Sequence, residues 1–101
     1  MSEQPFDAGD KAQVEKAKSK VQNKQARLED GFRQVMGSAN GRAFIWELLS
    51  ICGLFRTSFN PSNAITAFNE GQRNIGLEIM AKVHRLKPEK YIPMVRENSE
   101  P

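Results

Sequence analysis

The sequence has few of the residues on which most protein chemistry depends. It has one cysteine, Cys52, and one histidine, His84, among 101 residues. A single cysteine excludes an internal disulfide and suits a reducing compartment, and one histidine without a cysteine or carboxylate cluster makes no metal site. The sequence also lacks a glycine-rich phosphate loop and a paired-carboxylate pattern. We therefore expect a protein that is not an enzyme and that uses no metal or cofactor.

Long apolar runs are missing as well. The most apolar window, residues 43–55, is too short to span a bilayer and is interrupted by Glu47. The first nine residues do not have the basic stretch followed by an apolar run that is typical of a secretory signal peptide. We expect a soluble, intracellular protein without membrane contact.

The remaining composition is sufficient for one small helical domain. Apolar spacing of three and four residues, with no strand-like alternation, predicts an all-α fold of three to four helices at 31–97. A longer polar helix is predicted at 10–30, a disordered tail at 1–9 and a frayed end at 98–101. Because so small a core is marginal in a monomer, we expect either a homo-oligomer or docking on a partner.

The predicted N-terminal helix has half of a coiled-coil seam. Its apolar residues recur every seven positions, but the intermediate core positions are weak: Val14, Val21, Leu28 and Val35 against Ala17, Lys24 and Gly31. Two interpretations remain open. Either this is a solvated helix that lays a thin apolar edge on its own domain, or it is a helix that binds a partner or a second copy.

The same helix has a row of basic residues with no acid among them. These residues are Lys16, Lys18, Lys20, Lys24 and Arg27. Such a row suits a phosphate backbone or an acidic protein surface, although a merely solvated face is the simpler interpretation. No aromatic residue lies between these cations, and the net charge of +3 is modest, so nucleic acid is a secondary expectation.

The helix predicted at 41–52 is expected to be the central buried one. Gly37 would precede it in a left-handed conformation, and Gly53 would end it. Its buried stripe is predicted from apolar residues at helical spacing: Phe44, Leu48 and Cys52, with Ile45 and Leu49 alongside. Cys52 is therefore expected to be a buried structural thiol.

The last long helix is predicted to begin after Ser62 or Asn63 and to end near Leu86. Its two internal glycines, Gly71 and Gly76, suggest close approach of another backbone, from the central helix or from the preceding loop. A final short helix is expected to start at a proline and to run through a tyrosine, Pro88 to Tyr91.

A polar cluster is predicted around the connector at 54–62, whose ends Phe55 and Phe59 are expected to be anchored in the core. The cluster consists of Arg56, Thr57 and Ser58 in the connector and Asn69, Glu70 and Arg73 in the following helix. Asn69 or Glu70 is expected to reach the loop and hold Arg56. Two interpretations remain open: an internal strut that fixes the loop, or a surface that recognises a partner.

The same region of the sequence resembles a known family. The residues concerned are Gly41-Arg42, Trp46, Cys52-Gly53, Phe55 to Phe59, Phe68 to Gly71, Arg73-Asn74, Gly76-Leu77 and Pro88 to Tyr91. They are similar to those of a family of small tailed-phage proteins, known mainly from short-tailed phages and encoded among the head and portal genes. The resemblance covers roughly residues 30–95, and the family has no assigned activity.

The resemblance implies a non-enzymatic phage protein that acts by protein–protein interaction in virion structure or in head and portal assembly. Its partner would be a phage head, portal or scaffold protein. The alternative is a small phage effector that binds a host protein or nucleic acid through its basic N-terminal helix. We expect the protein in the bacterial host cytoplasm during infection and, on the first interpretation, in the virion.

Overall fold

The computed structural model describes residues 8–99, and the chain divides into two compact units, 1–31 and 32–101. The described residues form four α-helices and one short 3-10 helix, with no strand among them. The predicted all-α fold is therefore confirmed. Most of the predicted tail at 1–9 and the end of the predicted tail at 98–101 lie outside the described residues. No helix in the described part of the chain is long and apolar enough to cross a membrane.

Helix α1 (Ala8–Met36) passes through Gly31, so the predicted end at residue 30 is wrong. A Cβ at position 31 would have nothing within 4 Å, so this glycine weakens the helix without marking a close contact. Residues 10–28 are all exposed, including Val21 at 69% and Leu28 at 60%. In its described residues, the first unit is a helix without a core of its own.

The turn from α1 to α2 (Ala39–Ile51) is built around Ser38 and Gly41. The Ser38 Oγ accepts a hydrogen bond from the Gly41 amide at 3.0 Å, which caps α2. A Cβ at Gly41 would stand 1.7 Å from the carbonyl oxygen of Val35, so only glycine fits there. The left-handed conformation predicted for Gly37 is wrong, because Gly53 is the described residue with a positive φ, 75°.

Gly53 ends α2 as predicted, and it does so through a pair of terminal hydrogen bonds. The Leu54 amide donates to the Leu49 carbonyl at 3.1 Å, and the Gly53 amide donates to the Ser50 carbonyl at 3.0 Å. This is the Schellman arrangement, in which the residue after the cap adopts the left-handed conformation that glycine tolerates best.

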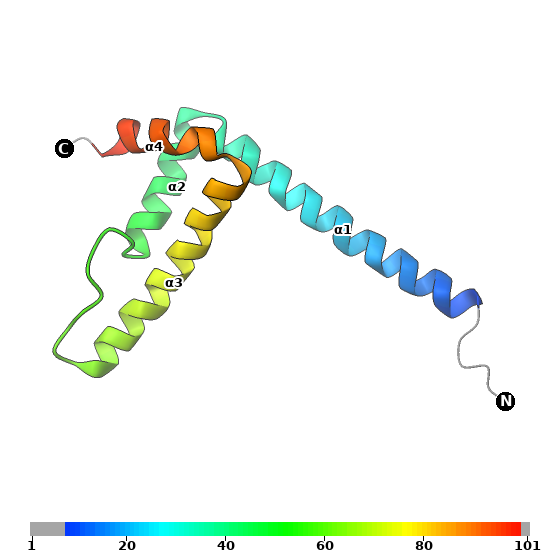
Figure 1. The fold of residues 1–101 in the computed structure, drawn as a ribbon, viewed down its shortest axis with the longest axis horizontal. Helices are drawn as coiled ribbons and strands as arrows, with labels where there is room; N and C mark the ends of the chain where they lie inside the picture. Colours follow the sequence, from blue (N-terminus) through cyan, green and yellow to red (C-terminus); the bar gives the residue numbers. More distant parts are fainter. Residues whose placement is uncertain (1–7, 100–101) are drawn as a thin grey trace. The chain divides into compact units, whose positions relative to one another are not determined.

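The core of the second unit lies where three helices meet. Helices α2 and α3 (Asn63–Leu86) form a hairpin. After a 3-10 turn, Pro88–Lys90, helix α4 (Tyr91–Asn98) crosses the end of the hairpin that is opposite the α2–α3 connector (Figure 1). Five hydrophobic side chains are buried there: Met36, Ile45, Leu49, Val83 and Met94. The opposite end of the hairpin, where the connector lies, has none of these buried residues.

The buried apolar residues of α2 are the two predicted alongside the main stripe, and not the stripe itself. Ile45 and Leu49 face the core, together with Arg42, while Phe44 is 55% exposed. Apolar residues lie on nearly every side of this helix, so periodicity alone could not decide which side packs against α3 and α4.

Helix α3 begins as predicted, with Ser62 as the cap. Its Oγ accepts from the Ile65 amide at 3.3 Å. The close approach expected at Gly76 is confirmed, because a Cβ there would lie 3.0 Å from the Cβ of Cys52. The same expectation for Gly71 is wrong, since nothing lies within 4 Å of its Cβ position.

The last helix is longer than predicted. Helix α4 begins at Tyr91 and continues through Pro93 to Asn98. Proline is tolerated there because it stands in the first turn, where the missing amide has no helical partner. The extension places Glu97 on a regular helix that faces α2.

Candidate functional site

The connector between α2 and α3 is tied to α3 by hydrogen bonds from successive turns of that helix. The Oγ1 of Thr66 donates to the Asn60 carbonyl and accepts from the Asn60 amide, both at 2.9 Å. The Nδ2 of Asn69 donates to the Ser58 carbonyl at 3.2 Å, and the Oγ of Ser58 donates to the carboxylate of Glu70. The loop is therefore fixed mainly by polar contacts rather than by burial.

A pocket of about 190 Å³ opens beside these contacts. It is lined by Cys52, Gly53, Arg56, Thr57, Ser58, Asn69 and Gln72. Four residues of the predicted partner-binding cluster are thus brought to one cavity, and Glu70 is joined to them through Ser58. Cys52 is only partly buried and lines the pocket, so its predicted burial is wrong.

The arginine of the loop does not take the predicted partner. The hydrogen bond that we expected between Arg56 and Asn69 or Glu70 is made by Ser58 instead. The chain turns sharply after Gly53, with the Arg56 amide donating to the Gly53 carbonyl at 3.2 Å. As a result the Arg56 guanidinium folds over Gly53, with Nη2 3.1 Å from the position of a Cβ there.

The remaining arginine of the cluster, Arg73, lies one helical turn beyond Asn69 and does not line the pocket. Its Nε is buried and has no hydrogen-bond partner within the described part of the chain. A buried N–H group is normally satisfied by water or by an acceptor on a bound partner. Because the Nε of Arg73 is buried, this donor atom is not on the surface of the protein.

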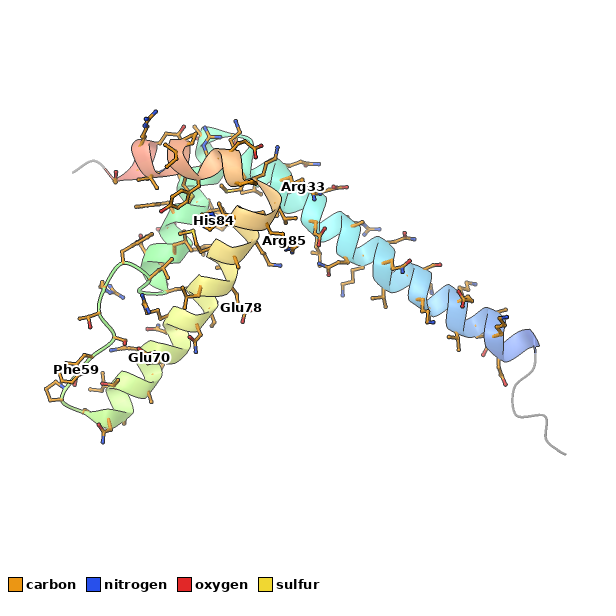
Figure 2. All side chains as sticks on the ribbon, viewed as in Figure 1. Arg33, Phe59, Glu70, Glu78, His84 and Arg85 are labelled. Atoms are coloured by element: carbon orange, nitrogen blue, oxygen red, sulfur yellow. The ribbon has the colours of Figure 1, made fainter. Side chains whose placement is uncertain are left out.

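The two phenylalanines of the connector behave differently. Phe55 stacks on Trp46 with ring centroids 4.5 Å apart, which fixes the first end of the loop on α2, but Phe55 is 49% exposed and is not anchored in the core as predicted. Phe59 is 74% exposed and stands at the end of the hairpin (Figure 2), so its predicted anchoring in the core is wrong. The Phe59 amide is held by the Oγ1 of Thr57 at 3.3 Å, which presents the ring outward without packing it.

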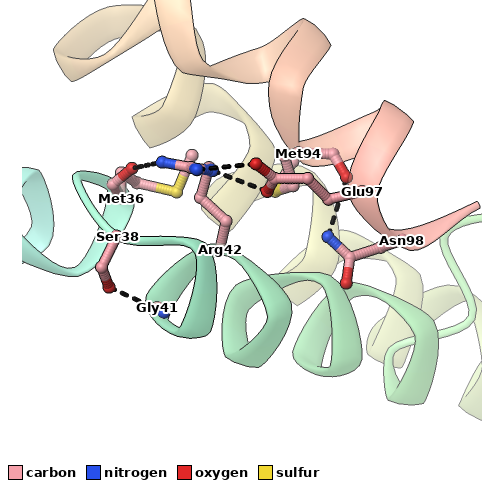
Figure 3. A network of polar contacts seen from close by, with 7 residues as sticks. All are labelled: Met36, Ser38, Gly41, Arg42, Met94, Glu97 and Asn98. Carbon is pink, nitrogen blue, oxygen red and sulfur yellow. Dashed lines mark hydrogen bonds and ion pairs between the residues drawn. The ribbon is translucent and has the colours of Figure 1, made fainter.

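An ion pair that the sequence reasoning missed joins α2 to α4. Arg42 is only 8% exposed, and its Nε and Nη2 donate to the two carboxylate oxygens of Glu97 at 2.8 and 2.7 Å (Figure 3). Its Nη1 donates to the carbonyl of Met36 at 2.9 Å, so one side chain ties together the end of α1, α2 and α4. A fork–fork pair of this kind fixes geometry as well as charge.

This pairing shifts the pKa of both groups. The hydrogen bonds from Arg42 lower the pKa of Glu97, and the same bonds raise the pKa of Arg42. A signal was available in the sequence, because Arg42 is one of two charged residues in the apolar stretch 39–55. An arginine in such a helix requires an acid to face it, but Glu97 lay beyond the predicted last helix.

The other predicted residues are not part of this site. The five basic residues from Lys16 to Arg27 are all exposed along α1, in the first unit. His84 is exposed, and its ring lies 4.8 Å from that of Tyr91. Within the described residues, no group of three or more His, Cys, Asp or Glu side chains is placed to hold a metal ion.

A comparison with protein families matches residues 32–96 to the Bbp19-like phage protein family. The matched segment contains the loop, the pocket and Arg42, and it leaves out the first unit. Neither the comparison with curated proteins nor that with solved structures gives a match. The expected membership of a phage protein family is confirmed: the chain belongs to the Bbp19-like phage proteins.

Proposed function

We propose that this phage protein is a non-enzymatic interaction protein in virion structure or in head and portal assembly. Its partner is a head, portal or scaffold protein, and it acts in the host cytoplasm while particles form or remains in the virion. The resemblance to a family encoded among head and portal genes of short-tailed phages supports this role, and so does the surface of the second unit.

The observation that carries the proposal is the apolar surface at the connector end of the hairpin. Phe59, Ile65 and Phe68 are exposed there, two of them by 66% or more. These three residues, here called the hairpin-end surface, come from the loop and from the first turns of α3. Large apolar side chains gathered in a small domain are typical of a surface that binds another protein.

Polar groups beside this surface would give the interaction its specificity. Arg56 and Thr57 line the adjacent pocket, and Arg73 lies one helical turn beyond Asn69. Arginine and aromatic residues dominate the binding energy of many interfaces when they are buried together. The strut and the recognition surface are then compatible: Ser58, Asn69 and Glu70 hold the loop, and Arg56 and Arg73 contact the partner.

Mass spectrometry of purified, nuclease-treated particles and of immature heads tests the proposal. We expect this protein at a fixed copy number relative to the portal and major capsid proteins in one or both. The copy number would distinguish the portal vertex from the shell. Absence from particles and from assembly intermediates would contradict the proposed role.

A matched pair of phage variants locates the contact. Phe59→Ser with Phe68→Ser should lower the amount of protein in particles or heads by about tenfold, because two exposed anchors are removed. The control is Ile75→Ser, an equally apolar and exposed residue farther along α3, which should leave the amount unchanged. Equal losses in both variants would mean that the hairpin end is not the contact.

A second candidate function is an effector that binds a host protein or nucleic acid through α1. The observation in its favour is the row of exposed cations from Lys16 to Arg27. Binding to nucleic acid through several lysines should weaken steeply between low and moderate salt, whereas docking through apolar surface should not. Binding of the purified chain to duplex DNA at two salt concentrations separates the two.

A further inference from the structure

The first unit presents an apolar stripe made of residues other than those of the hairpin-end surface. Val14, Val21 and Leu28 are all at least half exposed on α1. Residues seven apart in a helix lie almost above one another, so these three side chains form one continuous line. A helix without a core of its own gains most of its stability from packing such a line against another helix. The stripe therefore marks the side of α1 on which a partner helix would pack.

Basic side chains lie directly beside this stripe. Lys18 is four residues after Val14 and three before Val21, and Lys24 is three after Val21 and four before Leu28. Residues at these spacings are neighbours on a helix surface. Lys24 occupies a core position of the seven-residue repeat. A charged residue at such a position restricts which helices can pack there and in which register, at a cost in stability.

The next row continues the same charge. Lys20 and Arg27, seven residues apart, flank the stripe on its other side. Lys16 lies farthest from the stripe, about 140–160° around the helix from Val21 and Val14. Four cations thus flank the seam of the seven-residue repeat, with Lys18 and Lys24 nearest to the apolar line, and Lys16 lies beyond Lys20 and Arg27 on the outer side.

A second copy of this chain is a poor occupant for the stripe. From Lys11 to Leu28 there are six basic residues and one acid, Glu15. Two such helices would bring only basic and neutral side chains to the flanks of their seam, with no acid to pair with Lys18, Lys20 or Arg27. In a parallel pair in register, Lys24 would also meet the Lys24 of the other copy at a core position.

We propose that residues 14–28 of α1 bind an acidic amphipathic helix of another protein, as a heterotypic coiled coil. The partner's apolar residues cover Val14, Val21 and Leu28, and its carboxylates pair with the four flanking cations. A nucleic acid duplex would use the cations and leave the apolar line uncovered. The inference rests on the proposed function in treating the chain as a binding protein, and it concerns a different surface.

The test uses the purified full-length chain and a synthetic helix three heptads long. The probe has Leu at both core positions and Glu at both flanking positions, and a second peptide has Lys in place of Glu. Fluorescence anisotropy of the labelled peptides at neutral pH gives Kd. We expect the acidic peptide to bind and the basic peptide not to bind.

Two charge reversals only two residues apart provide the matched control. Lys18→Glu should weaken binding of the acidic peptide roughly fivefold to tenfold, because attraction is exchanged for repulsion beside the seam. Lys16→Glu makes the same change of charge on the outer side and should leave Kd unchanged within about twofold. Both variants lie in the exposed part of α1 and should leave the fluorescence of Trp46 in the second unit unaltered.

Three results would overturn the inference. The first is no binding of the acidic peptide. The second is an equal loss of peptide affinity with Lys16→Glu and Lys18→Glu, which is the pattern for binding through net charge alone. The third is self-association of the chain in sedimentation equilibrium that Val21→Ser with Leu28→Ser abolishes. Because only purified chain and peptide are used, each result is independent of whether the protein is found in particles.

Discussion

The two units of this chain are both helical, but different interactions keep them so. In the second unit, α2, α3 and α4 enclose five buried hydrophobic side chains and an ion pair between Arg42 and Glu97. In the first unit, the described residues from 10 to 28 are all exposed, and the sequence is rich in residues that favour helices intrinsically. The comparison separates helicity that comes from tertiary packing from helicity that comes from local propensity.

The largest effect that would test this comparison comes from Leu49→Ala. Leu49 is fully buried on α2, and the change should destabilise the second unit by about 3 kcal/mol, because it removes buried methyl groups and leaves a cavity. Urea unfolding followed through Trp46 measures this, since the only tryptophan lies in the second unit. The matched change in the first unit, Val21→Ala, should not move the midpoint. A shift of similar size with Val21→Ala would show that α1 depends on packing as the other helices do.

A smaller effect is expected on acidification. The pKa of Glu97 is lowered in the folded state by its hydrogen bonds with Arg42, so this pair stabilises the fold above the carboxyl group's unfolded pKa of about 4.3. That contribution is lost as the pH falls through the folded pKa. The urea midpoint should therefore decrease below pH ~4.3 in the wild-type chain.

The control for this acid effect is Arg42→Ala. It should cost about 2 kcal/mol at neutral pH and should lessen the further loss at low pH, because Glu97 no longer has its partner. The pKa of Glu89 is also lowered, mainly by a backbone hydrogen bond within that residue, but Glu89 is present in both proteins. An unchanged acid dependence in Arg42→Ala would mean that the pair does not stabilise the second unit.

The smallest effect distinguishes glycines that look alike in the sequence. Gly71→Ala should stabilise the second unit by about 0.5–1 kcal/mol, since a Cβ there has open space within a helix. Gly31→Ala should raise the helix content measured by circular dichroism without changing the unfolding midpoint reported by Trp46. Gly76→Ala should lower that midpoint, because its Cβ would crowd Cys52 at 3.0 Å. Equal effects at positions 71 and 76 would contradict the packing described for α3.

The polar contacts of the loop could be foreseen only in outline. Helical spacing correctly brought Ser58, Asn69 and Glu70 together, because one turn of α3 faces the connector. The partner of Glu70 was not predictable, since it depends on the sharp turn after Gly53 that directs Arg56 back over α2. Phe59 was misplaced for a related reason: an aromatic residue in a short loop usually packs inward, but hydrogen bonds already hold this loop.

By itself the sequence determined the fold class, where α2 and α3 begin and where α2 ends. Ser38 and Ser62 supply the caps, Gly53 supplies the left-handed end of α2, and the three- and four-residue apolar spacing sets the class. These are local properties, because each depends on residues within one or two turns of the helix. Only the tertiary structure decided which faces are buried. The choice of Ile45 over Phe44, and the pairing of Arg42 with a carboxylate 55 positions away, depend on how α4 crosses α2, and no local pattern encodes that crossing.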